Sequence, residues 1–138
     1  MITTQSVLLV LLGALLSSVA CRGAESPTAP TAVESPVTVT FASSLYAKGT
    51  VTRLFTAAQA GAVTVTLDSL GQPVVVGLAL GLTRADGAGC HGTTSVDTTA
   101  GSSPQIASQV DAGNYCVSIY DVGNVSDPVA FSITLVHP

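Results

Sequence analysis

The sequence predicts an all-β protein: an antiparallel β-sandwich of about seven strands, of the jelly-roll or immunoglobulin-like kind. Apolar and polar residues alternate with period two through residues 37–138, as in strands with one buried and one wet face. β-branched residues dominate this region, and no helical stripe interrupts it. Turns containing Gly, Pro or Asp separate the alternating runs at regular intervals. A closed β-barrel is the alternative fold.

Each alternating run predicts one strand. The runs lie at residues 37–41, 50–56, 61–70, 74–83, 105–110, 114–120 and 129–135. The run at 74–83 is apolar on both faces, which favours a central strand of a packed sheet. Within it, Gly77 and Gly81 predict the close approach of another backbone or a bulky side chain. Residues 84–104 are rich in Gly, Ser and Thr and are expected to form a long loop.

The charge composition excludes one class of partner. Charged residues make up 9% of the chain, against about 25% in a typical soluble domain. Four basic and eight acidic residues give a net charge of −4. Binding to phosphate backbones requires a clustered basic surface, so nucleic acid is not an expected partner.

The N-terminal segment indicates export. Residues 7–16 form an apolar run of ten residues (VLLVLLGALL), whereas a bilayer-spanning helix needs about 20. Small residues follow, and then Cys21. This arrangement resembles a bacterial lipoprotein signal peptide, which implies removal of residues 1–20 and acylation of Cys21. Because Arg22 follows, the resemblance further implies the outer membrane of the cell envelope. Ordinary cleavage after Ala20, giving a secreted soluble protein, is the alternative.

The remaining cysteines predict a disulfide. The chain has three cysteines, and an odd one in an exported protein needs an explanation. With lipid on Cys21, Cys90 and Cys116 form an even pair, which an oxidising compartment allows to bond. Cys116 alternates with its core-facing neighbours, so it points outward or toward the long loop. Two unpaired buried thiols are the alternative.

The chain is thus expected to have three parts. Residues 1–20 are the signal peptide and residues 37–138 are the sandwich. Between them, residues 21–36 are rich in Pro, Ser and Thr, which predicts an extended, disordered tether.

Four segments of the sandwich region carry a family resemblance. They are residues 49–55 (GTVTRLF), 61–67 (GAVTVTL), 110–119 (VDAGNYCVSI) and 131–135 (FSITL). In this order they resemble the bacterial pre-peptidase C-terminal domain, whose penultimate strand follows an "aGxY" turn. The resemblance spans about residues 49–137 and implies a β-sandwich that usually trails a secreted peptidase. The family's middle strand usually carries Asp, but here it reads PVVVGLAL, so no calcium site is expected.

No catalytic, metal or cofactor site is expected. His137 is the second-last residue and is expected to fray, while His91 adjoins Cys90, whose predicted disulfide removes it as a nucleophile. No G-x-S-x-G nucleophile elbow occurs. Five Asp residues fall in predicted turns or loops, where carboxylates cap backbone N–H groups: Asp86, Asp97, Asp111, Asp121 and Asp127.

The sequence therefore predicts a non-catalytic, lipid-anchored domain of the cell envelope. It would serve as an interaction or structural domain, attached to the membrane by its lipid and contacting a protein or glycan. One alternative is a module that binds a glycan or another extracellular polymer, with Tyr46 and Tyr120 as candidate exposed rings for stacking. Another is a self-assembling surface subunit, because so few charges protect the strand edges.

Overall fold

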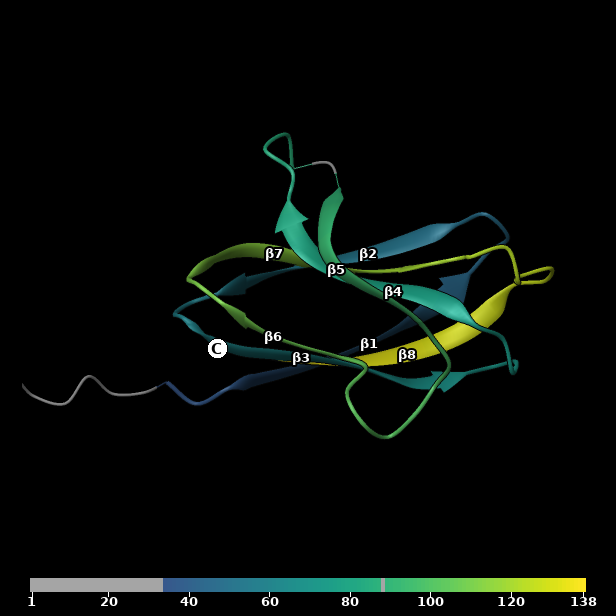
Figure 1. Ribbon diagram of the computed structural model, residues 1–138, viewed down its shortest axis with the longest axis horizontal. Coiled ribbons are helices and arrows are strands. Elements are labelled where there is room, and N and C mark those ends of the chain that lie inside the picture. The colour runs from purple at the N-terminus through teal and green to yellow at the C-terminus, as the bar shows by residue number, and fades with distance from the viewer. Residues whose placement is uncertain (1–33, 88) are drawn as a thin grey trace, which may run out of the picture. The chain divides into compact units, whose positions relative to one another are not determined.

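The computed structural model describes residues 34–138 except residue 88, and this part of the chain is all β (Figure 1). Its strands are β1 (Val37–Leu45), β2 (Thr50–Ala57), β3 (Gly61–Leu70), β4 (Val76–Thr83), β5 (Cys90–Thr98), β6 (Ile106–Val110), β7 (Gly113–Tyr120) and β8 (Val129–His137). No helix capable of crossing a bilayer occurs among the described residues. The predicted signal peptide, Cys21 and the tether up to residue 33 lie outside the described residues.

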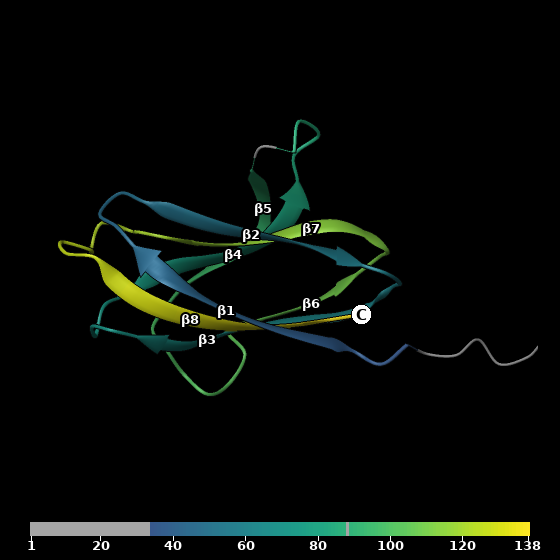
Figure 2. The same cartoon turned by 180° about the vertical axis from the view of Figure 1, so that it is seen from behind.

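The strands form two antiparallel sheets that pack face to face (Figures 1 and 2). The order is β1-β8-β3-β6 in the first sheet and β2-β7-β4-β5 in the second. The pairs are therefore β1 with β8, β2 with β7, β3 with β6, and β4 with β5, and the last of these is a hairpin. This is the order of an eight-stranded jelly roll, and it confirms the predicted antiparallel β-sandwich.

The core fills the space between the sheets, as the period-two alternation predicts. In β8, for example, Val129, Phe131, Ile133 and Leu135 are buried while the residues between them are more exposed. Each fully buried aliphatic or aromatic side chain contributes about 1.5–3 kcal/mol relative to exposure. The interior is therefore filled by aliphatic side chains and a few phenylalanines, such as Phe131.

One prediction about the fold is wrong. Residues 84–104 are not a continuous loop, because β5 lies within them and pairs with β4. Most of β5 is exposed on both faces, and only Val96 packs against the core. Its sequence, CHGTTSVDT, therefore shows no apolar alternation. The strand depends on its pairing with β4 and not on burial of its own side chains, so the sandwich has eight strands.

Candidate functional site

A disulfide joins Cys90 of β5 to Cys116 of β7, confirming the predicted pair. Cys116 is fully buried, yet it lies on the outer face of the second sheet, opposite the core-facing Val117 and Ile119. The strand β4 separates β5 from β7. In a flat sheet, strands on either side of a third lie about 9.5 Å apart, but these two Cα atoms are 5.6 Å apart. The start of β5 must therefore fold over the outer face.

Gly81 of β4 makes this fold-over possible. The β4–β5 register shifts between Leu80 and Gly81, and the hairpin beyond rises away from the first sheet in both views (Figures 1 and 2). A Cβ at Gly81 would collide with the carbonyl oxygen of His91 and the Cα of Gly92. The absence of a side chain thus lets the β5 backbone cross the sheet, confirming the predicted close approach.

Beside the disulfide, the outer face of the second sheet holds a hollow of about 280 Å³, here named the Tyr120 hollow. Its lining residues are Thr50, Ala79, Cys90, Gly92, Ser95, Ser118 and Tyr120. The lining is uncharged and carries hydroxyl groups from three strands. The hydroxyl of Ser118 is held by that of Thr52, 2.8 Å away, so Ser118 has a fixed orientation at the base of the hollow.

Tyr120 covers Gly77, the other glycine of β4. Tyr120 and Gly77 are direct partners in the β4–β7 ladder, and a Cβ at Gly77 would collide with the tyrosine ring. The ring therefore rests on the sheet where Gly77 leaves space, and the half-buried side chain keeps part of its surface open to solvent. The sheet therefore restricts the position of the Tyr120 ring.

Tyr46, the other candidate ring, lies apart from the hollow. It is 62% exposed and sits in the β1–β2 connection, and it is not one of the hollow's lining residues. The structure thus places Tyr120 in a hollow with neighbouring hydroxyls, but it does not bring Tyr46 into the same site.

Asp121 follows β7 and ties two loops together. One carboxylate oxygen accepts a hydrogen bond from the backbone N–H of Lys48, 2.8 Å away. The other accepts from the N–H groups of Gly123, Asn124 and Val125 at 2.7–3.0 Å. The Lys48 N–H is the largest cause that lowers the pKa of Asp121, and the other three lower it further. Both oxygens are engaged by donors, which is the turn-capping role predicted for the aspartates.

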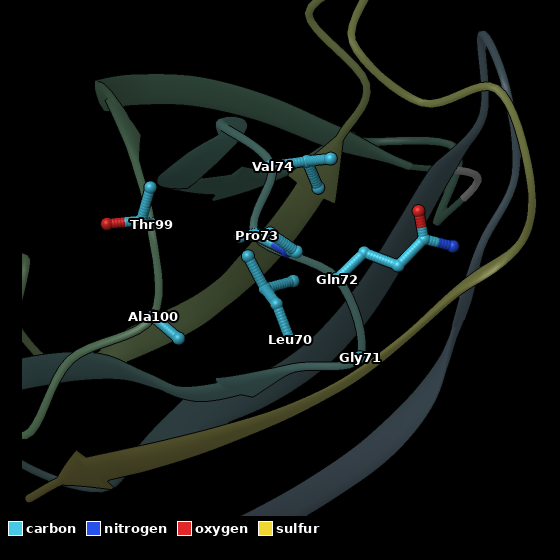
Figure 3. A pocket seen from close by; sticks show the side chains of 7 residues that line it. All are labelled: Leu70, Gly71, Gln72, Pro73, Val74, Thr99 and Ala100. Carbon is cyan, nitrogen blue, oxygen red and sulfur yellow. The ribbon is translucent and has the colours of Figure 1, made fainter.

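A larger hollow, of about 480 Å³, lies between two loops and was not predicted from the sequence (Figure 3). Its lining residues are Leu70, Gly71, Gln72, Pro73, Val74, Thr99 and Ala100. The side chain of Gln72 extends away from Thr99 and Ala100 in Figure 3, leaving Leu70 and Pro73 between them. This hollow is formed where the β3–β4 connection meets the segment after β5. It could not be predicted while residues 84–104 were expected to form one long loop.

A third hollow, of about 560 Å³, lies between the end of β2 and the β4–β5 connection. It includes Arg84 and the half-exposed Leu54 among its lining residues.

The two histidines lie in different sheets, His137 in β8 and His91 in β5. His137 does not fray: it is 7% exposed, and its ring centroid lies 5.0 Å from that of Phe55. The prediction is wrong because β1 pairs with β8 as far as His137, opposite Val37, and β3 pairs with β8 as far as Val136. His91 is exposed on β5. Within residues 34–138, residue 88 aside, no group of three or more His, Cys, Asp or Glu side chains is placed to hold a metal ion.

Comparison with known proteins leaves the chain without a family assignment. No protein-family model matches it, and no curated protein matches its sequence.

Proposed function

We propose that this protein is a non-catalytic domain of the cell envelope, anchored by acylated Cys21 and serving as an interaction or structural domain. The observation that carries the proposal is the Cys90–Cys116 bond, which uses two of the three cysteines and leaves Cys21 over. Structural disulfides persist in oxidising, exported compartments, which supports export. Cys21 directly follows the apolar run and small residues of a lipoprotein-like signal.

Acylation at this position would provide a stable anchor. One acyl chain binds a membrane only marginally, whereas two or more chains hold it firmly. With Arg22 after the cysteine, we propose the outer membrane as the location. The resemblance to pre-peptidase C-terminal domains supports the same kind of role, that of a β-sandwich accompanying exported proteins.

The test is the intact mass of the protein extracted from membranes of a bacterial host that expresses the full chain. We expect a mature chain that begins at Cys21 and carries the mass of two or three acyl chains. Cys21→Ser should move the exported protein to the soluble fraction, while Cys90→Ser, the matched control, should keep the lipid. A wild-type chain that begins at Cys21 without added mass would overturn the proposal.

A second candidate function is the binding of a glycan or another neutral, hydroxyl-rich polymer at the Tyr120 hollow. The observation that favours it is the combination of a ring backed by Gly77 with hydroxyls of Thr50, Ser95 and Ser118 in an uncharged lining. Sugars present apolar C–H faces to aromatic rings and hydroxyls to polar groups, so this lining matches their chemistry.

Glycan arrays test this candidate with two tyrosine variants. Tyr120→Ala should abolish the binding that the wild type shows, because it removes the ring. Tyr46→Ala removes an exposed ring outside the hollow and should leave binding unchanged. Thermal unfolding of each variant separates lost binding from lost structure. A wild-type protein that binds no glycan, or equal losses in the two variants, would exclude the hollow as a glycan site.

A further inference from the structure

The sandwich has four edge strands, and each presents one row of unpaired backbone N–H and C=O groups. They are β1 and β6 in the first sheet and β2 and β5 in the second. Such an edge is a template for pairing with another strand unless charges, bulges, proline or short length protect it. The four edges of this molecule differ sharply in that protection.

Three of the edges carry a protective feature. β2 has Arg53 in the same phase as the core-packed Val51 and Phe55, a charge directed toward the interior side of an edge. The start of β5, up to the register shift at Gly92, leaves the plane of its sheet, and the strand carries Asp97. β6 is only five residues long. Each feature opposes the addition of a further strand.

The fourth edge, β1, has none of these features. Its nine residues, VTVTFASSL, include no charge, proline or glycine. All nine pair with β8 in one register, from Val37 to Leu45, without a bulge. The strand is also rich in Val and Thr, residues that favour strand pairing. Among the described strands, β1 is therefore a long, regular and uncharged edge that remains open.

We propose that β1 pairs antiparallel with β1 of a second copy of this chain. A two-fold axis through Phe41 places Thr40 opposite Ala42 and Thr38 opposite Ser44 of the second copy, so every side chain keeps its face. No like charges meet in this register, because the strand has none. The two first sheets then form one continuous eight-stranded sheet.

The chain's own preceding segment is a poorer occupant of this edge. Residues 22–36 include Pro27, Pro30 and Pro36, which have no backbone N–H to donate, and the carboxylates of Glu25 and Glu34. A regular ladder on the β1 edge needs an uncharged strand free of proline. Within this sequence, β1 itself has that character, which makes a second copy the matching partner. This pairing does not depend on acylation of Cys21.

Light scattering after size exclusion tests the pairing on the exported chain carrying Cys21→Ser, which removes lipid from the measurement. We expect a dimer that dissociates on dilution. Thr40→Lys should weaken association about tenfold or more, because it places two like charges on one face, diagonally across the two-fold axis from each other. Thr64→Lys is the matched control: Thr64 lies on the first sheet in β3, an interior strand, and its change should leave association intact.

Hydrogen exchange identifies the surface used. The β1 amides that are unpaired within one copy should exchange slowly at high protein concentration and quickly on dilution. Thermal unfolding shows whether Thr40→Lys remains folded. A monomer at every concentration would overturn the proposal, and so would a dimer that persists in the folded Thr40→Lys variant with fast-exchanging β1 amides.

Discussion

At the scale of single residues, two glycines of β4 determine the shape of the outer face of the second sheet. Gly77 leaves room for the ring of Tyr120, and Gly81 leaves room for the backbone of β5. In both cases the neighbour occupies the place of a Cβ. The Tyr120 hollow therefore depends on what these positions lack as much as on the side chains that line it.

Gly77→Ala should destabilise the protein by about 1–3 kcal/mol, as overpacking usually does. The new methyl group must displace the ring of Tyr120. Gly81→Ala should cost more, because its Cβ meets backbone atoms that have no rotamer to change. Gly92→Ala is the matched control, since its Cβ would meet only the Cβ of Ala79 at 3.4 Å. Urea unfolding measures all three, and equal midpoints for them would contradict this account.

Asp121 gives the stability a predictable dependence on pH. Four backbone N–H groups, that of Lys48 foremost, hold its pKa in the folded protein below the ordinary value of 3.8. Its charge therefore contributes stability that is complete above the ordinary pKa and is lost as the pH falls through the folded-state pKa. Asp121→Asn should lower the melting temperature at neutral pH, and its difference from the wild type should narrow in acid.

Asp127→Asn is the control for this measurement. Asp127 is exposed and accepts a bond from the Ser126 hydroxyl, so its replacement should change the melting temperature little at any pH. A difference between Asp121→Asn and the wild type that stays constant from neutral to acid pH would show that the carboxylate charge does not matter.

At the scale of elements, β5 is the strand with the least support from the core. It pairs along β4 only, and its start is fastened to β7 by the Cys90–Cys116 bond. The cysteines are 26 residues apart. In the chain-entropy model a bridge of this span contributes about 3.5 kcal/mol, a large part of a typical total of about 5–15 kcal/mol.

Reduction of the disulfide should therefore lower the melting temperature clearly and free the start of β5 first. Hydrogen exchange should show lost protection in β5 and in the end of β4, while β3 and β8 keep theirs. The double variant Cys90→Ser and Cys116→Ser should behave like the reduced protein. If β5 exchanges no faster after reduction than before, the bond is not what holds the strand.

At the scale of the whole molecule, the outer faces of the sheets carry few charged side chains. Most charged residues of the sandwich lie in turns or loops, such as Lys48, Asp86 and Asp111, and the outer faces carry mainly hydroxyls. On the first sheet, Thr40 and Thr134 are hydrogen-bonded at 3.2 Å, and Thr134 donates to Asp68. Such faces resist association weakly. The uncharged edge of β1 and the uncharged lining of the Tyr120 hollow both reflect this low content of charged side chains.

The sandwich was predictable from the sequence, because most strands bury one face and therefore alternate, while β4, buried on both faces from Val76 to Gly81, is apolar throughout. In β3, for example, the alternating Val63, Val65 and Leu67 are all fully buried. The cysteine pair was predicted on the expectation that Cys21 carries lipid, and the structure confirms the bond between Cys90 and Cys116. The positions of Gly77 and Gly81 predicted close contacts, but the sequence did not show which groups make them.

The contacts between strands that are distant in the sequence could not be predicted from it. β5 buries little, so no periodicity marks it, and its position depends on β4 and on Cys116. The neighbours of Tyr120 in its hollow come from β2, β4, β5 and β7. The retention of His137 depends on β1 and β3, which flank it from distant parts of the chain. Local sequence records whether a residue is buried, whereas the partner that buries it is chosen by the pairing of strands across the fold.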